Sequence, residues 1–246
     1  MLRDFLIGSD YDGTTGNTFA KGPGIITVKE AYRLAIERVL GEDYAEKFVK
    51  GGGHRNRSPL EIMKDLVPDA KPDDLRRYER ESTNYRIKLL RTQIGKKLPN
   101  GKEWGGPIDG FAETWTAVNE LKRSHSNLKT AIISAGHTAF IAQFFEHYGL
   151  QLPDAMVTAD VLSEACLSIP PEEQAKPAVM PMRLARVLTG VSDDAKILYI
   201  GDDPTKDRLF AENSGAEFVL VKPGREAESW QEFLMKVENA VNACTL

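Results

Sequence analysis

Residues 5–18 read FLIGSDYDGTTGNT. The apolar residues Phe5, Leu6 and Ile7 predict a short buried strand, and the chain then runs into two aspartates, Asp10 and Asp12. An Asp-Gly pair after a strand is also an ordinary turn signal. The alternative is that two carboxylates are held at the carboxyl end of a strand, where open α/β sheets bind their ligands. The choice between these interpretations depends on partners elsewhere in the chain.

The bulk composition narrows the class of protein. The 246 residues fit one large domain or a core with a smaller domain, and 41% of them are hydrophobic, enough for a packed interior. The formal net charge of −4 argues against a general nucleic-acid-binding protein. Cys166 and Cys244 match no metal-ligand spacing, so we expect reduced thiols and a cytoplasmic location. No apolar run is long enough to span a bilayer. We therefore expect a soluble monomer or homodimer with no nucleic-acid or membrane partner.

Five apolar runs rich in β-forming residues are predicted to be strands, and helical patterns alternate with them. Strands that alternate with helices indicate βαβ units and a parallel sheet, hence an α/β fold. The five runs are residues 5–7, 130–133, 155–157, 197–200 and 218–221.

The segment of residues 18–105 contains helical patterns and no convincing strand. One apolar stripe runs from Val28 to Val39 and another from Leu75 to Leu89, both at the three-to-four spacing of a helix. The glycine-rich stretches on either side suit domain boundaries. We therefore predict an all-helical insertion at residues 18–105 and a core made of residues 1–17 and 106–246.

The predicted insertion is basic and the core is acidic. Residues 18–105 hold 19 Lys and Arg against 13 Asp and Glu, a net charge of +6, which leaves −10 for the rest of the chain. The stretch KGGGHRNRSP at residues 50–59 concentrates His54, Arg55 and Arg57. We hypothesise that these side chains contact an anionic or polyhydroxylated group of a substrate; a solvated loop is the alternative.

Three further segments place polar side chains after predicted core strands. AIISAGHT supplies Ser134, QAKPAVMP supplies Lys176, and ILYIGDDPTKD supplies Asp202, with Asp203 and Asp207 close behind. Each has an ordinary structural interpretation when taken alone, as a helix cap, a surface lysine or a capped loop.

Taken in order, Asp-x-Asp-Gly-Thr, Ser, Lys and Gly-Asp-Asp resemble the motifs of the haloacid dehalogenase (HAD) superfamily, whose members are mostly phosphatases. The resemblance covers most of the predicted core, and the helical insertion stands where that family carries its type 1 cap domain. It implies a Rossmann-like parallel sheet with an all-helical cap.

The resemblance also assigns chemical roles to the acidic residues. Asp10 is expected to attack phosphorus and form an aspartyl-phosphate, and Asp12 to act as general acid and then general base. A carboxylate and a phosphate ester repel each other, so a cation is needed, and Mg²⁺ prefers such hard oxygen ligands. Its expected ligands are Asp10, Asp202 and the backbone carbonyl of Asp12. Asp203 and Asp207 are further ligands or outer hydrogen-bond acceptors, and the sequence leaves both roles open.

The phosphate group is expected to be bound by backbone and side chains from three of the motifs. Gly13 lets the chain approach the phosphate closely, and the Thr14 amide, Ser134, Ala135 and Lys176 surround its oxygens.

The function that follows is Mg²⁺-dependent hydrolysis of a small phosphomonoester, with a small phosphorylated metabolite as the partner. Phosphomutases of the β-phosphoglucomutase type also keep both aspartates, so they are the nearest enzymatic alternative. A catalytically idle HAD fold that acts as a binding or regulatory module is the alternative from another class.

Overall fold

The computed structural model describes residues 4–53, 59–166 and 169–243. The chain divides into two compact units: unit 1 consists of Met1–Asn17 and Gly105–Leu246, and unit 2 consists of Thr18–Trp104. Unit 1 resumes at Gly105, whose backbone N–H donates a hydrogen bond to the carbonyl of Asn17 at 2.9 Å.

Unit 1 is an α/β domain built on a five-stranded parallel sheet with the order β3-β2-β1-β4-β5. The predicted α/β fold is thereby confirmed. Its strands are β1 (Phe5–Ser9), β2 (Leu128–Ile133), β3 (Ala155–Val157), β4 (Lys196–Gly201) and β5 (Glu217–Leu220). Its helices are α5 (Phe111–Ser124), α6 (Thr138–His147), α7 (Ala159–Ala165), α8 (Pro171–Gln174), α9 (Met180–Thr189), α10 (Lys206–Asn213) and α11 (Glu226–Ala243).

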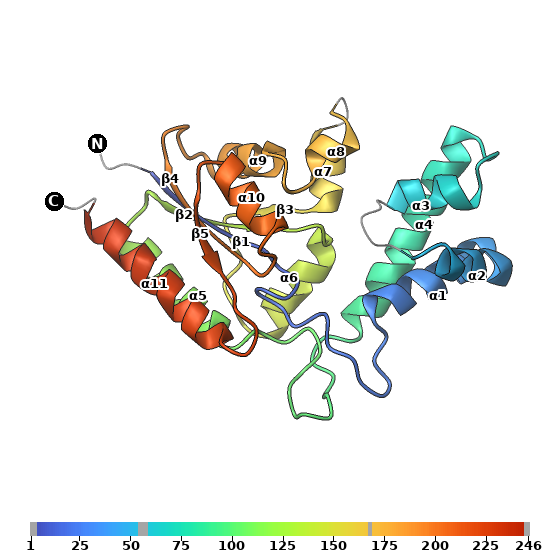
Figure 1. Cartoon of the computed structure of the whole chain (residues 1–246), viewed down its shortest axis with the longest axis horizontal. Coiled ribbons are helices and arrows are strands. Elements are labelled where there is room, and N and C mark those ends of the chain that lie inside the picture. Colours follow the sequence, from blue (N-terminus) through green and yellow to red (C-terminus); the bar gives the residue numbers. More distant parts are fainter. Residues whose placement is uncertain (1–3, 54–58, 167–168, 244–246) are drawn as a thin grey trace. The chain divides into compact units, whose positions relative to one another are not determined.

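Helices cover both faces of this sheet (Figure 1). On one face, an aromatic cluster joins Phe111 of α5, Phe144 of α6 and Trp230 of α11. On the other, apolar residues of α7, α9 and α10 pack against β1, β2 and β4. Every residue of β1 is buried because this strand lies between β2 and β4. Burial on both faces accounts for its continuous apolar run.

The register of the sheet brings three strand ends together. Ile7 of β1 is paired with Thr130 of β2 on one side and with Leu198 of β4 on the other. Because all three strands are parallel, the residues that follow them emerge at the same edge of the sheet. The side chains that the sequence places after β1, β2 and β4 therefore meet in space.

Unit 2 contains four described helices: α1 (Val28–Leu40), α2 (Glu42–Lys50), α3 (Pro59–Leu66) and α4 (Pro72–Arg91). Helix α1 begins after Thr27, whose side chain accepts a hydrogen bond from the Glu30 N–H and so caps the helix. All four helices contribute to one apolar core, in which Ile36, Phe48 and Ile62 are buried. No described helix of the chain has the length and apolar character that crossing a membrane would require.

Candidate active site

The candidate site lies at the carboxyl ends of β1, β2 and β4. Asp10 follows β1, Ser134 follows β2, and Asp202 follows β4. Backbone hydrogen bonds continue past the strands and fix two of these positions: the Asp10 N–H donates to Ile200 at 2.9 Å, and the Ser134 N–H donates to Val157 at 3.0 Å. The sheet itself therefore positions these side chains.

A tight turn follows Asp10. The carbonyl oxygen of Tyr11 accepts hydrogen bonds from the N–H groups of Thr14, Thr15 and Gly16 at 3.3, 2.9 and 2.8 Å. Gly13 has a φ of 78°, in the left-handed region where a side chain would be strained. The left-handed conformation explains why a glycine follows Asp12. The Asp12-Gly13 pair is thus both a turn signal and part of the candidate site.

Side chains from the turn and from α11 hold it in place. The backbone carbonyl of Asp10 accepts hydrogen bonds from the hydroxyls of Ser9 at 2.8 Å and Thr15 at 2.7 Å. The indole N–H of Trp230 donates to the carbonyl of Thr14 at 3.2 Å. The loop that carries Asp10 is therefore anchored to a helix more than 200 positions later in the chain.

The hydroxyl of Tyr11 has no hydrogen-bond partner among the described residues, although its side chain is completely buried. Burying an unsatisfied hydroxyl costs roughly 1–3 kcal/mol. We expect Tyr11→Phe to leave the stability unchanged or to raise it by about 1 kcal/mol, measured by denaturant unfolding. Tyr199→Phe is the contrasting variant, because the Tyr199 hydroxyl is hydrogen-bonded; a larger loss for Tyr11→Phe than for Tyr199→Phe would contradict the prediction.

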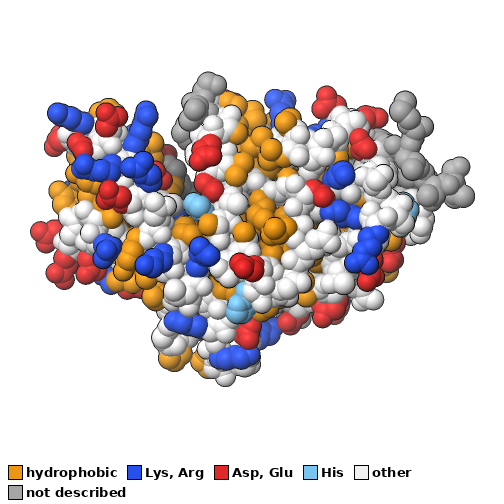
Figure 2. Space-filling model, turned by 180° about the vertical axis from the view of Figure 1, so that it is seen from behind, with side chains coloured by type: hydrophobic (Ala, Val, Ile, Leu, Met, Phe, Trp, Pro, Cys, Tyr) orange, Lys and Arg blue, Asp and Glu red, His pale blue; other side chains and the backbone are white. Residues whose placement is uncertain are grey.

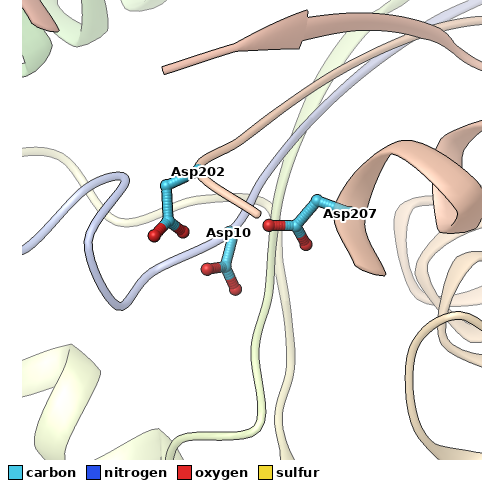
Figure 3. Close-up of side chains that lie close together, drawn as sticks. All are labelled: Asp10, Asp202 and Asp207. Atoms are coloured by element: carbon cyan, nitrogen blue, oxygen red, sulfur yellow. The ribbon is translucent and has the colours of Figure 1, made fainter. Parts of the chain in front are cut away.

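Three carboxylates converge at the centre of the site. Asp10, Asp202 and Asp207 each offer an oxygen, and the three oxygens lie within 4.8 Å of one another. Figure 3 shows their side chains pointing toward a common space from the ends of β1 and β4 and from α10. The hydroxyl of Thr14 donates to Oδ1 of Asp202 at 3.0 Å and orients that carboxylate.

Lys176 connects two of these carboxylates. Its Nζ lies 2.6 Å from Oδ1 of Asp10 and 2.6 Å from Oδ1 of Asp207, and it donates to the hydroxyl of Tyr199 at 3.0 Å. The Lys176 side chain is only 7% exposed, so both ion pairs are shielded from water. Lys176 lies in the loop between α8 and α9, and it reaches the strand ends from a different part of the fold than either aspartate.

Crowding of charge alters the acidity of this cluster. Burial raises the pKa of Asp10 from 3.8 to about 8, the ion pair with Lys176 opposes that rise, and the charges of Asp207 and Asp12 add to it. Burial also raises the pKa of Asp202, against the hydrogen bond from Thr14. Burial is the largest cause for both residues, because a charged carboxylate is destabilised when it is removed from water.

The two remaining aspartates of the GDDPTKD segment have different roles in the structure. Oδ1 of Asp203 accepts hydrogen bonds from the N–H groups of Thr205 and Lys206, both at 2.8 Å, so it caps the start of α10. Asp207 joins the buried cluster instead, and its carboxyl carbon lies 2.5 Å from where a Cβ on Gly201 would stand. A glycine at position 201 is therefore needed for Asp207 to reach the site.

The other residues predicted for the phosphate lie around this cluster. Ser134 is buried, and its Oγ accepts the N–H of Gly136 at 2.9 Å, which leaves its own hydroxyl hydrogen available to donate. Ala135 is exposed, and Asp12 is half-buried. The Thr14 amide, predicted to bind phosphate, is 3.3 Å from the carbonyl of Tyr11 in this structure.

The predicted substrate-contacting residues of the helical insertion, His54, Arg55 and Arg57, lie outside the described residues. The hypothesis that these side chains contact a group of a substrate therefore stays a prediction.

Sequence reasoning missed Tyr199 and Trp230 as parts of the site. Tyr199 is buried on β4, accepts a hydrogen bond from Lys176 and lies 3.3 Å from Oδ1 of Asp207. A tyrosine within an otherwise aliphatic buried strand was the available signal, because a buried hydroxyl needs a partner. Trp230, Phe233 and Val237 recur at the three-to-four spacing of a helix, which predicts only a packed face, and no local pattern pointed to the Thr14 carbonyl.

Comparison with known proteins adds to this geometry. A sequence model of the HAD-like hydrolase family matches residues 174–241. The β-phosphoglucomutase of Clostridium difficile aligns with a TM-score of 0.57 at 13% identity, covering 98% of both chains. CbbY of Rhodobacter sphaeroides, solved with phosphate, aligns with a TM-score of 0.50 at 15% identity, covering 88% of this chain and 85% of CbbY. No curated protein matches the chain.

The chain has the HAD fold. A haloacid dehalogenase-like hydrolase from Bacteroides fragilis extends the comparison, with a TM-score of 0.53, 16% identity and coverage of 92% and 93% of the two chains. The predicted resemblance to the HAD superfamily is confirmed at the level of the fold. At these identities the alignment says nothing about substrate, so function must be argued from the side chains themselves.

Proposed function

We propose that this HAD-fold protein is a Mg²⁺-dependent phosphatase that hydrolyses a small phosphomonoester through an aspartyl-phosphate on Asp10. The observation that carries the proposal is the convergence of Asp10, Asp202 and Asp207 with Lys176 at the strand ends. Burying mutually repelling carboxylates together costs free energy, and a bound divalent cation would offset their repulsion. Such a cluster is therefore typical of a functional site.

The donor set fits magnesium, which takes hard oxygen ligands. Asp207 is already occupied at both oxygens, Oδ1 by Lys176 and Oδ2 by the Asp203 N–H at 3.1 Å. Asp10 and Asp202 are therefore the residues that would hold the ion, together with the Asp12 carbonyl that the sequence resemblance implies. Bound there, Mg²⁺ would neutralise charge on the phosphate and on the attacking carboxylate. The role of Asp207 is to hold Lys176.

Asp10 and Asp12 divide the chemistry between nucleophile and proton carrier. The sheet holds the Asp10 backbone and Lys176 contacts its buried carboxylate, so the carboxylate keeps one orientation for attack on phosphorus. Asp12 is half-buried and thus able to exchange a proton with the leaving alcohol and then with the attacking water. Splitting hydrolysis into two displacements lowers the barrier of each.

Ser134 and Lys176 would bind the phosphate oxygens. The Ser134 hydroxyl keeps a hydrogen to donate, and Lys176 supplies a positive charge next to the carboxylate of Asp10, the proposed nucleophile. Choice among phosphate esters falls to another part of the chain, because the core groups contact only phosphate. We assign that selection to unit 2, as a cap.

The test is inorganic phosphate release from a panel of phosphorylated sugars, phosphoglycolate, nucleotides and p-nitrophenyl phosphate, with Mg²⁺ or with EDTA. Asp202→Asn should lower the Mg²⁺-dependent rate at least about 100-fold, since it removes a proposed ligand. Asp203→Asn is the matched control: asparagine also caps helices, so the rate should stay within about twofold. Equal losses in both variants would contradict the assignment of the ion to Asp202.

A phosphomutase is the second candidate, because the β-phosphoglucomutase type also keeps both aspartates, Asp10 and Asp12 in this chain. Both enzymes would form the same aspartyl-phosphate, and they differ in whether water or a sugar hydroxyl receives the phosphoryl group. Phosphorus NMR of a reaction with a sugar monophosphate distinguishes them, because a mutase yields an isomeric sugar phosphate and a phosphatase yields inorganic phosphate.

The pKa of Asp10 predicts how the metal-free protein responds to pH. The folded value of about 8 lies above the ordinary 3.8, so between these values the folded state binds a proton that the unfolded state has lost. The stabilising contribution is complete below about pH 4 and is lost as the pH rises through 8, with a slope of at most about 1.4 kcal/mol per pH unit. In EDTA, wild type should lose stability from pH 5 to 8.5 more steeply than Asp10→Asn in urea unfolding. Parallel profiles would contradict the prediction.

A further inference from the structure

Arg86, on α4 of the helical unit, has an unusual environment for an arginine. The residue is only 9% exposed, and its Nε has no hydrogen-bond partner among the described residues. Its guanidinium carbon lies 4.0 Å from the centre of the Tyr32 ring, so the two groups are in cation–π contact. The aromatic ring covers the guanidinium but accepts none of the directional hydrogen bonds that its N–H groups can donate.

The other described arginines of the same unit are paired with acids or exposed to water. Arg33 forms ion pairs with Glu30 and Glu37 at 2.8 and 2.6 Å, and Arg77 pairs with Asp74 at 3.0 Å. Figure 2 shows Lys and Arg side chains interspersed with Asp and Glu on the surface of this unit, at the left of the view. These solvated charges are ordinary for a helical surface, whereas Arg86 is buried.

The charge of Arg86 persists at neutral pH, and no carboxylate among the described residues is paired with it. Burial lowers its pKa to about 10, and burial is the sole cause of that shift, so no described carboxylate acts on it. Residues 54–58, which the structure does not describe, include two arginines and no acid. Burying a guanidinium that lacks an anionic partner costs folding free energy, which the contact with Tyr32 offsets in part and a bound anion would offset further.

We propose that Arg86, held against Tyr32, binds an oxyanion, the carboxylate or phosphate group of a ligand. A guanidinium is planar and its N–H donors form a fork, which matches the two oxygens of such a group. In one respect this rests on the proposed function: a phosphomonoester that carries a second acidic group is one source of the oxyanion. A separate anion is the other source of the same chemistry.

The first experiment measures anion binding without turnover. Malonate, a dicarboxylate that is not a phosphate, is titrated in EDTA, at constant ionic strength, by calorimetry and thermal unfolding. Arg86→Met should bind at least about tenfold more weakly than wild type and lose the anion-induced rise in Tm. Arg86→Lys keeps the charge but not the fork, so it should bind several-fold more weakly and serves if Arg86→Met does not fold. Arg76→Met, an exposed arginine on the same helix, is the matched control and should bind like wild type.

Binding that is equal in wild type and in both Arg86 variants would overturn the proposal. So would the absence of any saturable binding in wild type. Since no metal or turnover is involved, these outcomes are independent of whether the protein is a phosphatase.

The second experiment identifies the source of the anion. With Mg²⁺, Arg86→Met should raise KM for phosphoglycolate, which carries a carboxylate, about tenfold or more and leave p-nitrophenyl phosphate unchanged if the substrate supplies the oxyanion. An unchanged KM for both esters, with anion binding lost in the first experiment, would assign the site to a separate anion. No turnover of any ester by wild type would reject the phosphatase, and the first experiment alone would then decide the Arg86 site.

Discussion

Replacing Asp10 with asparagine should reduce Mg²⁺-dependent phosphate release by roughly 10³- to 10⁶-fold, because an amide cannot form the aspartyl-phosphate. The side chain is nearly isosteric, so the turn after β1 should keep its hydrogen bonds to the Asp10 backbone carbonyl. The effect should therefore appear in kcat rather than in folding. Steady-state phosphate release, with circular dichroism of both proteins, measures the two quantities separately.

A covalent readout strengthens this prediction. Acid-quenched wild type, mixed with substrate and Mg²⁺, should carry a phosphoryl group on the peptide that contains Asp10, and Asp10→Asn should carry none. The Asp203→Asn variant should be phosphorylated like wild type, since the Asp203 carboxylate caps α10. If Asp10→Asn keeps more than about a tenth of the wild-type rate, Asp10 is not the nucleophile and the proposed mechanism is wrong.

The second large effect is on stability and concerns Lys176. Lys176→Met should lower the free energy of unfolding by about 3–5 kcal/mol at pH 8 in EDTA, because it leaves the buried carboxylates of Asp10 and Asp207 without their common cation. The loss should be smaller at pH 5, where protonation of Asp10 removes part of the uncompensated charge. Urea unfolding at the two pH values measures both quantities.

Two further variants test the cause of that loss. Lys222→Met is the matched control, because its ion pair with Glu232 is exposed and surface pairs contribute less than about 1 kcal/mol. The double variant Lys176→Met with Asp207→Asn should recover part of the stability, as expected when two residues share one interaction. A loss for Lys176→Met no larger than that for Lys222→Met would show that the buried ion pairs do not stabilise the fold.

Much of unit 1 could be predicted because its signals are local. A buried strand in a parallel sheet is a short apolar run, and a helix packed on one side shows apolar residues at every third or fourth position. The predicted run at residues 197–200 corresponds to β4, and the spacing of Trp230, Phe233 and Val237 corresponds to α11. In unit 2, the stripes beginning at Val28 and Leu75 correspond to α1 and α4, whereas no stripe indicated α2.

The sequence by itself determined which chemical groups are available and the order in which they follow the strands: Asp10 after β1, Ser134 after β2 and Asp202 after β4. Only the tertiary structure decided how the remaining aspartates act. Asp203 and Asp207 are four positions apart, yet Asp203 caps α10 and Asp207 pairs with Lys176. The difference arises on folding, which brings Asp207 against Gly201 and brings in Lys176 from a loop 31 positions earlier in the chain. The same holds for Arg86, whose burial against Tyr32 no periodicity could reveal, since contacts between distant segments depend on packing rather than on spacing.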